Sequence, residues 1–304
     1  MTAKKLHFGP LKPGKVFLTI HGTLSEADLA FYEGYDPTFI CKKAAALFGI
    51  YSNAASFKEF AASWEWPVDS TDEGFLGALA TEIHCASFHQ FEGLLALLLA
   101  EYQNRPDWVY LTSYGNYEMK TAARALAKGD FEQITSGAHK TADDFVRAAV
   151  YGGLKLEDGE HNEAFKHSVG DIAWLIAHCA EEFVEGNEYN AYKHGLRVVS
   201  GAATLAVRPL DAVGPFTSIL SMKHSVSYLE ISEAPNAYTG QRVTKELSPE
   251  YSYNVIAAIA KVLTIIRAMR IARIRGSVEF VDFIDLDRDK LLSQQARSKM
   301  SFSF

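Results

Sequence analysis

The segment that decides the fold reads DIAWLIAHCAEEFVEGNEYNAYKHG and runs from Asp171 to Gly195. A helix turns by about 100° per residue, so one face of this segment carries a continuous stripe of side chains. In chain order the stripe consists of Ile172, Ile176, Cys179, Phe183, Asn187, Asn190 and His194. The first four side chains of the stripe are apolar and the last three are polar. Because all seven share one face, the polar three are predicted to be buried as well.

Buried amides and imidazoles need hydrogen-bond partners, because each costs about 1–3 kcal/mol when it is left unpaired. The sequence therefore predicts a buried polar network of Asn187, Asn190, His194 and, from an earlier helix, His84. Such a network serves either packing specificity or a functional pocket. The pattern leaves both readings open.

Two further long helices are expected. The stretch Ser70-Thr71-Asp72-Glu73 has the form of a capping box and begins a helix that ends at about Gln103. Ser248-Pro249 begins another helix, which runs to about Arg275, and residues 222–232 and 240–247 favour a small β-hairpin. The predicted fold class is mainly α, a bundle of long helices with a small hairpin or strand appendage.

The chain is expected to divide into three parts. Residues 1–70 hold a strand at Val16–Ile20 and short helices, and residues 71–210 form the helical core with the long helices at about 71–103 and 163–193. Residues 211–304 hold the hairpin, the third long helix, a final strand at Val278–Ile284 and a tail that is mobile or docks on a partner. The last part is expected to pack with the core as one domain.

Composition narrows the function classes. The 304 residues carry a net charge of −7, which argues against a surface that binds nucleic acid over its whole extent. Three widely spaced cysteines indicate reduced thiols and a cytoplasmic protein, and neither a secretory signal nor a membrane span is expected. A phosphate-binding glycine loop, a nucleophile elbow, a Cys-x-x-Cys pair and a His-Glu-x-x-His motif are all absent from the sequence.

A metal site is the alternative interpretation of the long helices. Helical bundles build di-iron sites from carboxylates and imidazoles one turn apart, and two such pairs occur here. The four residues are His89, Glu92, His178 and Glu181. Their order is the reverse of the usual Glu-x-x-His and one face is strongly acidic, so the leading prediction is no metal cofactor, with iron or manganese as the alternative.

Two short motifs carry a resemblance to a known family. The stretch Asn190-Ala-Tyr-Lys-His-Gly195 and the earlier Phe88-His-Gln-Phe-Glu-Gly-Leu-Leu95 resemble uncharacterised bacterial helical proteins related to the HEPN superfamily. HEPN ribonucleases use an Arg-x4-6-His motif across a dimer interface, which makes His194, with Asn190, the implied catalytic pair. Residues 187–189 hold no arginine, so phosphate would lack its cation and catalysis is expected to be degenerate or absent.

The resemblance implies a cytoplasmic protein that acts by association as a homo-oligomer, with RNA or a protein partner, in defence or stress response. Whether the chain is an enzyme stays open. Arg270 and Arg273 are candidate phosphate ligands near the end of the third long helix. The competing interpretation pairs these arginines with the acidic residues of the segment 279–287.

Overall fold

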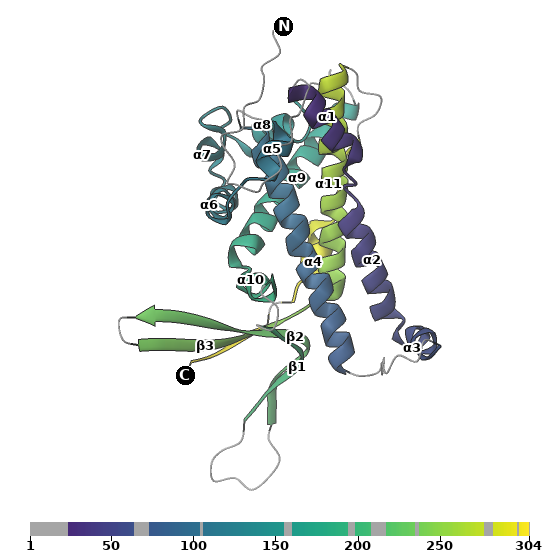
Figure 1. The fold of residues 1–304 in the computed structure, drawn as a ribbon, viewed down its shortest axis with the longest axis vertical. Helices are drawn as coiled ribbons and strands as arrows, with labels where there is room; N and C mark the ends of the chain where they lie inside the picture. The colour runs from purple at the N-terminus through teal and green to yellow at the C-terminus, as the bar shows by residue number, and fades with distance from the viewer. Residues whose placement is uncertain are drawn as a thin grey trace, which may run out of the picture. The chain divides into compact units, whose positions relative to one another are not determined.

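The computed structural model describes residues 24–63, 73–103, 106–154, 160–193, 198–207, 217–234, 237–276, 282–296 and 298–303. Most of the described residues are helical, and the described strands form one small antiparallel sheet. Figure 1 shows long helices together with this sheet. The predicted class, mainly α with a small β appendage, is confirmed.

The described elements follow one another in a simple order. The helices are α1 (Leu24–Gly34), α2 (Phe39–Ser52), α3 (Ala54–Ala62), α4 (Glu73–Ala100), α5 (Asp107–Leu111), α6 (Asn116–Ala127), α7 (Phe131–Thr135), α8 (Ala142–Ala149), α9 (Glu160–Glu185), α10 (Asn187–Lys193), α11 (Pro249–Arg275) and α12 (Arg288–Ser293). The strands are β1 (Val198–Val207), β2 (Thr217–Ala234), β3 (Ala237–Glu246) and β4 (Lys299–Ser303).

The chain forms two compact units. The first unit consists of residues 1–37, 92–181 and 261–285, and the second consists of residues 38–91, 182–260 and 286–304. Each unit is therefore built from three separate segments, and helices α4, α9 and α11 contribute residues to both. The three-part division at residues 70 and 210 remains a prediction.

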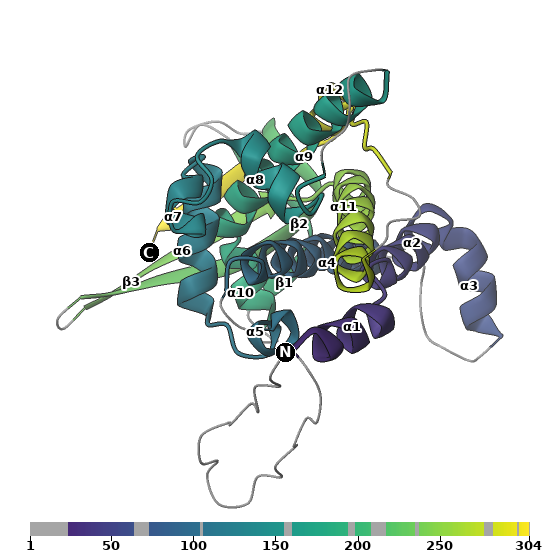
Figure 2. The same ribbon diagram turned by 90° about the horizontal axis from the view of Figure 1, so that it is seen from above.

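The first unit packs short helices around apolar and aromatic side chains. The C-terminal part of α4 is apolar nearly all round, and each residue of Leu94–Ala100 is buried. Helices α6, α7 and α8 lie together (Figure 2), and the ring of Phe145 on α8 lies 5.1 Å from that of Phe131 on α7. Asp130 caps α7 by accepting the N–H of Gln133 at 3.1 Å, which fixes the turn between α6 and α7.

In the second unit, helices α2, α4 and α11 share a small apolar cluster of Ala44, Ala86 and Ile256. The start of α4 also packs against the sheet, where Ala80 contacts Val226 and Leu247. A Cβ on Gly77 would lie only 2.9 Å from the Cα of Gly201 on β1. Glycine at position 77 therefore allows the helix backbone to approach the strand closely.

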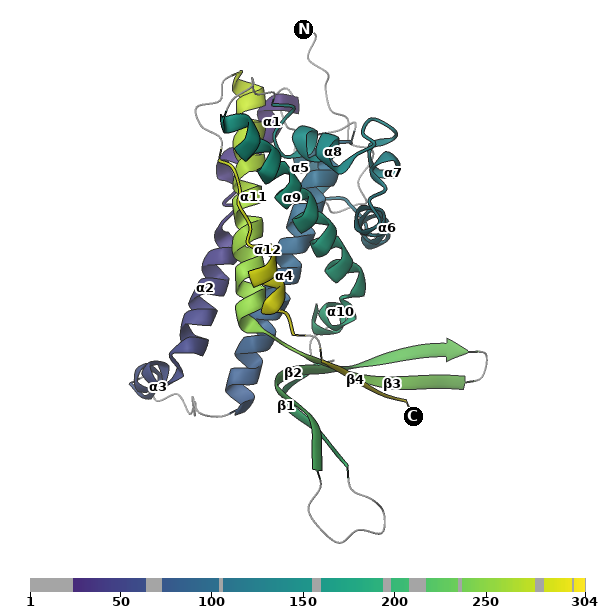
Figure 3. The same cartoon turned by 180° about the vertical axis from the view of Figure 1, so that it is seen from behind.

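The sheet has the strand order β1-β2-β3-β4 and is antiparallel throughout. The predicted hairpin is confirmed, since β2 and β3 pair from Ser225 opposite Glu246 to Ala234 opposite Ala237. The tail is not a mobile end, because β4 pairs along β3 (Figure 3). Residues 282–284 are not a strand, and the rest of the expected final strand, like the one at 16–20, lies outside the described residues.

Helix α4 is the one helix in the described part of the chain that is long and apolar enough to cross a membrane. Its most apolar window has a mean hydropathy of 1.2, and 78% of that window is buried inside the structure. Burial of this kind is typical of a core helix in a soluble protein.

The long helix expected over 163–193 is interrupted. Helix α9 ends at Glu185 and α10 begins at Asn187, with Gly186 between them. A Cβ at Gly186 would overlap the ring of Phe88, so this close approach requires glycine. The break changes the direction of the side chains that follow, and the projected stripe does not continue past it.

Candidate association surface

The two faces of the sheet differ in what covers them. Side chains alternate between the faces of a strand, and the register places Val226, Tyr228 and Val243 on the inner face, where all three are buried. On the outer face, Val199 lies opposite Ser227, and Leu229 lies opposite Arg242. Residue 242 in turn pairs with Phe302 of β4, so β1, β2, β3 and β4 all contribute to the outer face.

Large apolar side chains on the outer face are exposed to solvent. The exposed fractions are 65% for Val199, 55% for Leu229, 62% for Ile231 and 49% for Phe302. The other large exposed hydrophobic residues described are Phe39, Phe60, Trp108 and Tyr117, which are spread over four different helices. Single exposed apolar residues are ordinary, whereas several of them on one face are typical of an interaction surface.

A broad hollow of about 1130 Å³ adjoins this row. Asn187, Asn190 and Ala191 of α10 line it on one side, and the sheet lines it on the other with residues that include Leu229 and Ile231. The side-chain amide of Asn187 donates to Glu230 at 3.1 Å, so the start of α10 lies against β2. Glu230 alternates with Leu229 and Ile231, so α10 contacts the inner side of β2 and the hollow reaches round the edge of this strand. We call the row of exposed apolar side chains the outer sheet face.

A buried ionic contact holds α10 in this position. Glu188 is buried, and its carboxylate accepts a hydrogen bond from Nζ of Lys245 on β3 at 2.8 Å. Its other oxygen lies 3.3 Å from Nε2 of His84 on α4. Burial alone raises the pKa of a carboxyl, but the hydrogen bond and charge of His84 and the charge of Lys245 outweigh it and lower the pKa of Glu188 to about 2.

Ring stacking completes the attachment of α10 to α4. The rings of Phe88 and Tyr189 stack with centroids 5.1 Å apart. The hydroxyl of Tyr192 donates to Glu82 at 2.6 Å. The predicted packing of the helix of residues 82–99 against residues 172–194 is confirmed by these contacts, although α10 makes them and not one unbroken helix.

A second, polar cavity of about 340 Å³ lies beside His84. Glutamates 182, 185, 188 and 246 line it together with Lys245 and Lys299. Ser252 Oγ lies 3.5 Å from His84 Nδ1, which produces a serine–histidine–glutamate order, but 3.5 Å is at the outer limit of a hydrogen bond. Lys245 also neutralises Glu188, so the arrangement is better suited to anchoring α10 than to activating a nucleophile.

The predicted polar network is corrected by this geometry. Asn187 and Asn190 are exposed, so their predicted burial is wrong, and Glu188 and Tyr189 are buried in their place. The physical reason is the helix break at Gly186. His84 belongs to a polar network as expected, with Glu188 as its partner, while His194 lies outside the described residues. Gly186 itself was the sequence signal for the break.

The four residues of the alternative metal site have other neighbours. The ring of His89 lies edge-on to Tyr189, the hydroxyl of Tyr114 donates to Glu92 at 3.2 Å, and the ring of His178 stacks on Trp174. In the described part of the chain, three potential metal ligands cluster at His167, Asp171 and Asp285. None of the four predicted ligands, Glu181 included, belongs to that group.

The two candidate phosphate ligands bind carboxylates of the first unit. Arg270 and Arg273 both donate to Glu101, Arg273 at 2.7 Å, and Arg270 Nε lies 3.6 Å from Asp107. Burial lowers the pKa of Arg270 to about 10, which leaves the side chain charged at neutral pH. Arg270 and Arg273 are thus paired with acidic residues, as the competing interpretation expected, but the partners are Glu101 and Asp107 and not residues 279–287. Because these carboxylates already neutralise the two guanidinium groups, phosphate would have to displace them.

Searches of family models, curated proteins and solved structures found no match to this chain. Function is therefore inferred from the contacts and surfaces of the chain itself.

Proposed function

We propose that the chain acts by association, and that its outer sheet face binds a second copy of the same chain. The observation that supports this is the exposed row of Val199, Leu229, Ile231 and Phe302 on one face of the sheet. Apolar area removed from water contributes about 25 cal/mol per Å². A two-fold interface would bury the same row on both copies at once.

The chemistry of this face favours a protein partner over RNA. An RNA-binding surface needs clustered basic side chains or aromatic platforms over a positively charged groove. Here Arg242 lies among aliphatic residues and Glu230 is close by, on a chain with a net charge of −7. Association with RNA and a role in defence or stress response remain predictions of the resemblance.

The HEPN-like resemblance supports the choice of a second copy, since the proteins it points to work across a dimer interface. We propose degenerate or absent nuclease activity, because the resemblance lacks its arginine. A cytoplasmic location is part of the same proposal, and the three free cysteines, two of them buried, support a reducing compartment.

Sedimentation velocity over a range of concentrations tests the association. The wild-type chain is expected to form dimers below about 100 µM, and Ile231→Glu is expected to leave a monomer because it places a charge in the apolar row. Tyr117→Glu is the matched control, since Tyr117 on α6 is 83% exposed and lies outside the row. A wild type that stays monomeric, or dimers that survive Ile231→Glu, would contradict the proposal.

Fluorescence anisotropy with a mixed pool of RNA separates the competing partner. RNA binding that is lost in Arg242→Glu and kept in Ile231→Glu would assign this face to nucleic acid. No binding by either variant or by the wild type is the expected result.

A further inference from the structure

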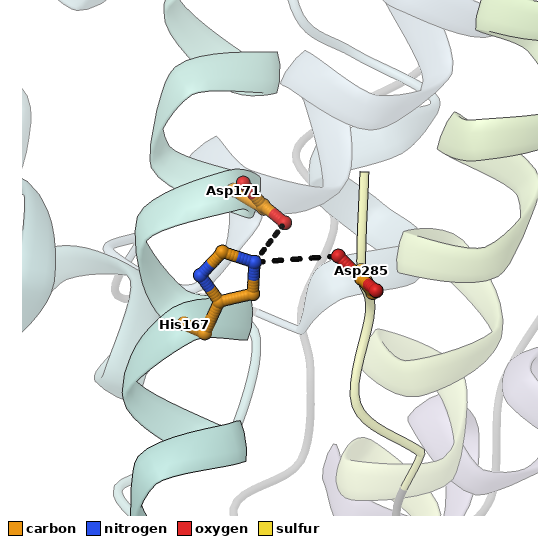
Figure 4. Close-up of side chains that lie close together, drawn as sticks. All are labelled: His167, Asp171 and Asp285. Atoms are coloured by element: carbon orange, nitrogen blue, oxygen red, sulfur yellow. Dashed lines mark hydrogen bonds and ion pairs between the residues drawn. The ribbon is translucent and has the colours of Figure 1, made fainter. Parts of the chain in front are cut away.

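Three side chains of the first unit converge on one point outside the surfaces described above. His167 and Asp171 lie one turn apart on α9, and Asp285 lies in the segment between α11 and α12 (Figure 4). Nε2 of His167 is 3.5 Å from Oδ2 of Asp171 and 3.3 Å from Oδ1 of Asp285. The three ligand atoms all lie within 4.8 Å of one another.

The helix fixes two of these side chains. Residues four apart project from the same face of a helix, which brings the imidazole of His167 over Asp171. The Asp171 side chain is only 1% exposed. A carboxylate at that depth is favoured when a cation lies beside it.

A buried serine fixes the third side chain. The Oγ of Ser168 on α9 accepts the backbone N–H of Ile284 at 2.6 Å and lies 2.7 Å from the hydroxyl of Tyr151. The ring of Phe283 packs against Phe165 with centroids 5.6 Å apart. These contacts attach the chain on the N-terminal side of Asp285 to α9, so the carboxylate is held beside His167 although it is itself 90% exposed.

The two distances from the imidazole to the carboxylates suit ligands that share one metal ion. Metal–ligand distances of about 2.0–2.2 Å in a tetrahedral site place the ligand atoms about 3.3–3.6 Å apart. A charge-assisted hydrogen bond from a protonated imidazole is shorter, about 2.7–2.9 Å, whereas Nε2 of His167 lies at 3.3 and 3.5 Å from two carboxylates at once. Two carboxylates and a neutral imidazole also carry the charge that a dication neutralises.

We propose that His167, Asp171 and Asp285 bind one divalent transition-metal ion, Zn²⁺ or Mn²⁺. The imidazole suits Zn²⁺, and the two carboxylates also suit Mn²⁺. The exposed fraction of His167, 64%, leaves the ion accessible from solvent, and three protein ligands leave a further coordination position for water. The site lies wholly within the first unit and does not depend on the proposed association.

Isothermal titration of the tag-free chain, stripped with EDTA, with zinc chloride and with manganese chloride tests the site. One equivalent is expected to bind, and Asp285→Asn and His167→Gln are each expected to weaken binding at least about tenfold. Asp282→Asn is the matched control, because it makes the same change in an exposed carboxylate of the same segment. His178→Gln removes an imidazole of the same helix and should bind like the wild type.

Thermal melts with and without the metal separate binding from misfolding. The metal should raise the melting temperature of the wild type and of Asp282→Asn more than that of Asp285→Asn. Asp285 is the better test residue, since replacing the buried Asp171 risks the fold itself. A wild type that binds neither metal with a Kd below about 1 mM, equal binding by Asp285→Asn and His167→Gln, or loss of binding in His178→Gln would overturn the proposal.

Discussion

The two units each bury a carboxylate, and the two carboxylates respond to burial in opposite ways. Glu188 in the second unit has nitrogen donors at 2.8 and 3.3 Å, and its pKa is lowered to about 2. Asp107 in the first unit accepts the hydroxyl of Tyr32 at 2.6 Å, but the nearest arginine nitrogen is 3.6 Å away. Burial consequently raises the pKa of Asp107.

The difference shows that a nearby cation does not by itself lower the pKa of a buried acid. Lys245 donates to Glu188 directly, with a second contact to the backbone carbonyl of Glu185. Arg270 instead donates to Glu101 and leaves its Nε without a hydrogen bond. A cation whose hydrogen bonds go to a second acid offsets only part of the desolvation of the first.

The largest effect is expected from Arg270→Met. Arg270 is 3% exposed, and its removal leaves Glu101 and Asp107 without the cation between them. Breaking a buried pair by removing one partner costs about 3–5 kcal/mol, which urea denaturation at pH 7 measures. The loss should shrink at lower pH, where the two carboxyls take up protons.

Arg273→Met is the control for that prediction. Arg273 donates to the same Glu101 at 2.7 Å but is 52% exposed, so its loss should cost less than about 1 kcal/mol. Equal losses of stability in the two variants would show that Arg270 contributes no more than a surface ion pair. The account of the buried charges in the first unit would then be wrong.

Acid titration of stability is expected to separate the wild type from Glu188→Gln. The pKa of Glu188 is lower in the folded chain than its ordinary value of 4.5, so its contribution is present above pH 4.5 and is lost as the pH falls toward 2. Between pH 6 and pH 3 the wild type should lose about 2 kcal/mol more than Glu188→Gln.

Asp107→Asn should shift the same profile in the other direction. A carboxyl with a raised pKa binds its proton more readily in the folded chain, so its contribution grows as the pH falls. Asp107→Asn should therefore lose more stability on acidification than the wild type. Parallel profiles for both variants would contradict the assignment of opposite pKa shifts.

Local signals in the sequence were enough for much of the fold. Ser248-Pro249 marks the start of α11, and the end at Arg275 agrees with the expected one. The apolar part of the stripe is also confirmed, since Ile172, Ile176 and Cys179 are buried. These features depend on neighbours within a few turns, which helix caps and periodicity report directly.

The features that sequence reasoning missed depend on partners far away in the sequence, or on a helix break that turns the following side chains to another face. Carrying a 100° projection across Gly186 put Asn187 and Asn190 inside, although the break places them outside. The partner of Arg270 is Glu101, which lies 169 positions earlier. The strand β4 forms only by pairing with β3, and a short polar tail contains no local pattern that indicates such a partner.

The smallest effect is expected from Ser252→Ala, which tests whether the His84 network anchors α10 or performs chemistry. Ser252 is buried, and its Oγ is 3.5 Å from His84 Nδ1, so losing this weak contact should cost about 0.5 kcal/mol. Ser248→Ala is the matched control and should cost about 1 kcal/mol, because Ser248 caps α11 by accepting the N–H of Tyr251 at 3.2 Å.

Thermal melts and hydrolysis of a fluorogenic ester are measured on both variants. An anchor leaves the wild type and Ser252→Ala equally inactive toward the ester, since the 3.5 Å between Ser252 Oγ and His84 Nδ1 is too long for efficient proton transfer from the hydroxyl to the imidazole. Ester cleavage that Ser252→Ala abolishes at an unchanged melting temperature, and that Ser248→Ala retains, would show that the second unit uses its buried carboxylate for catalysis and not for attachment.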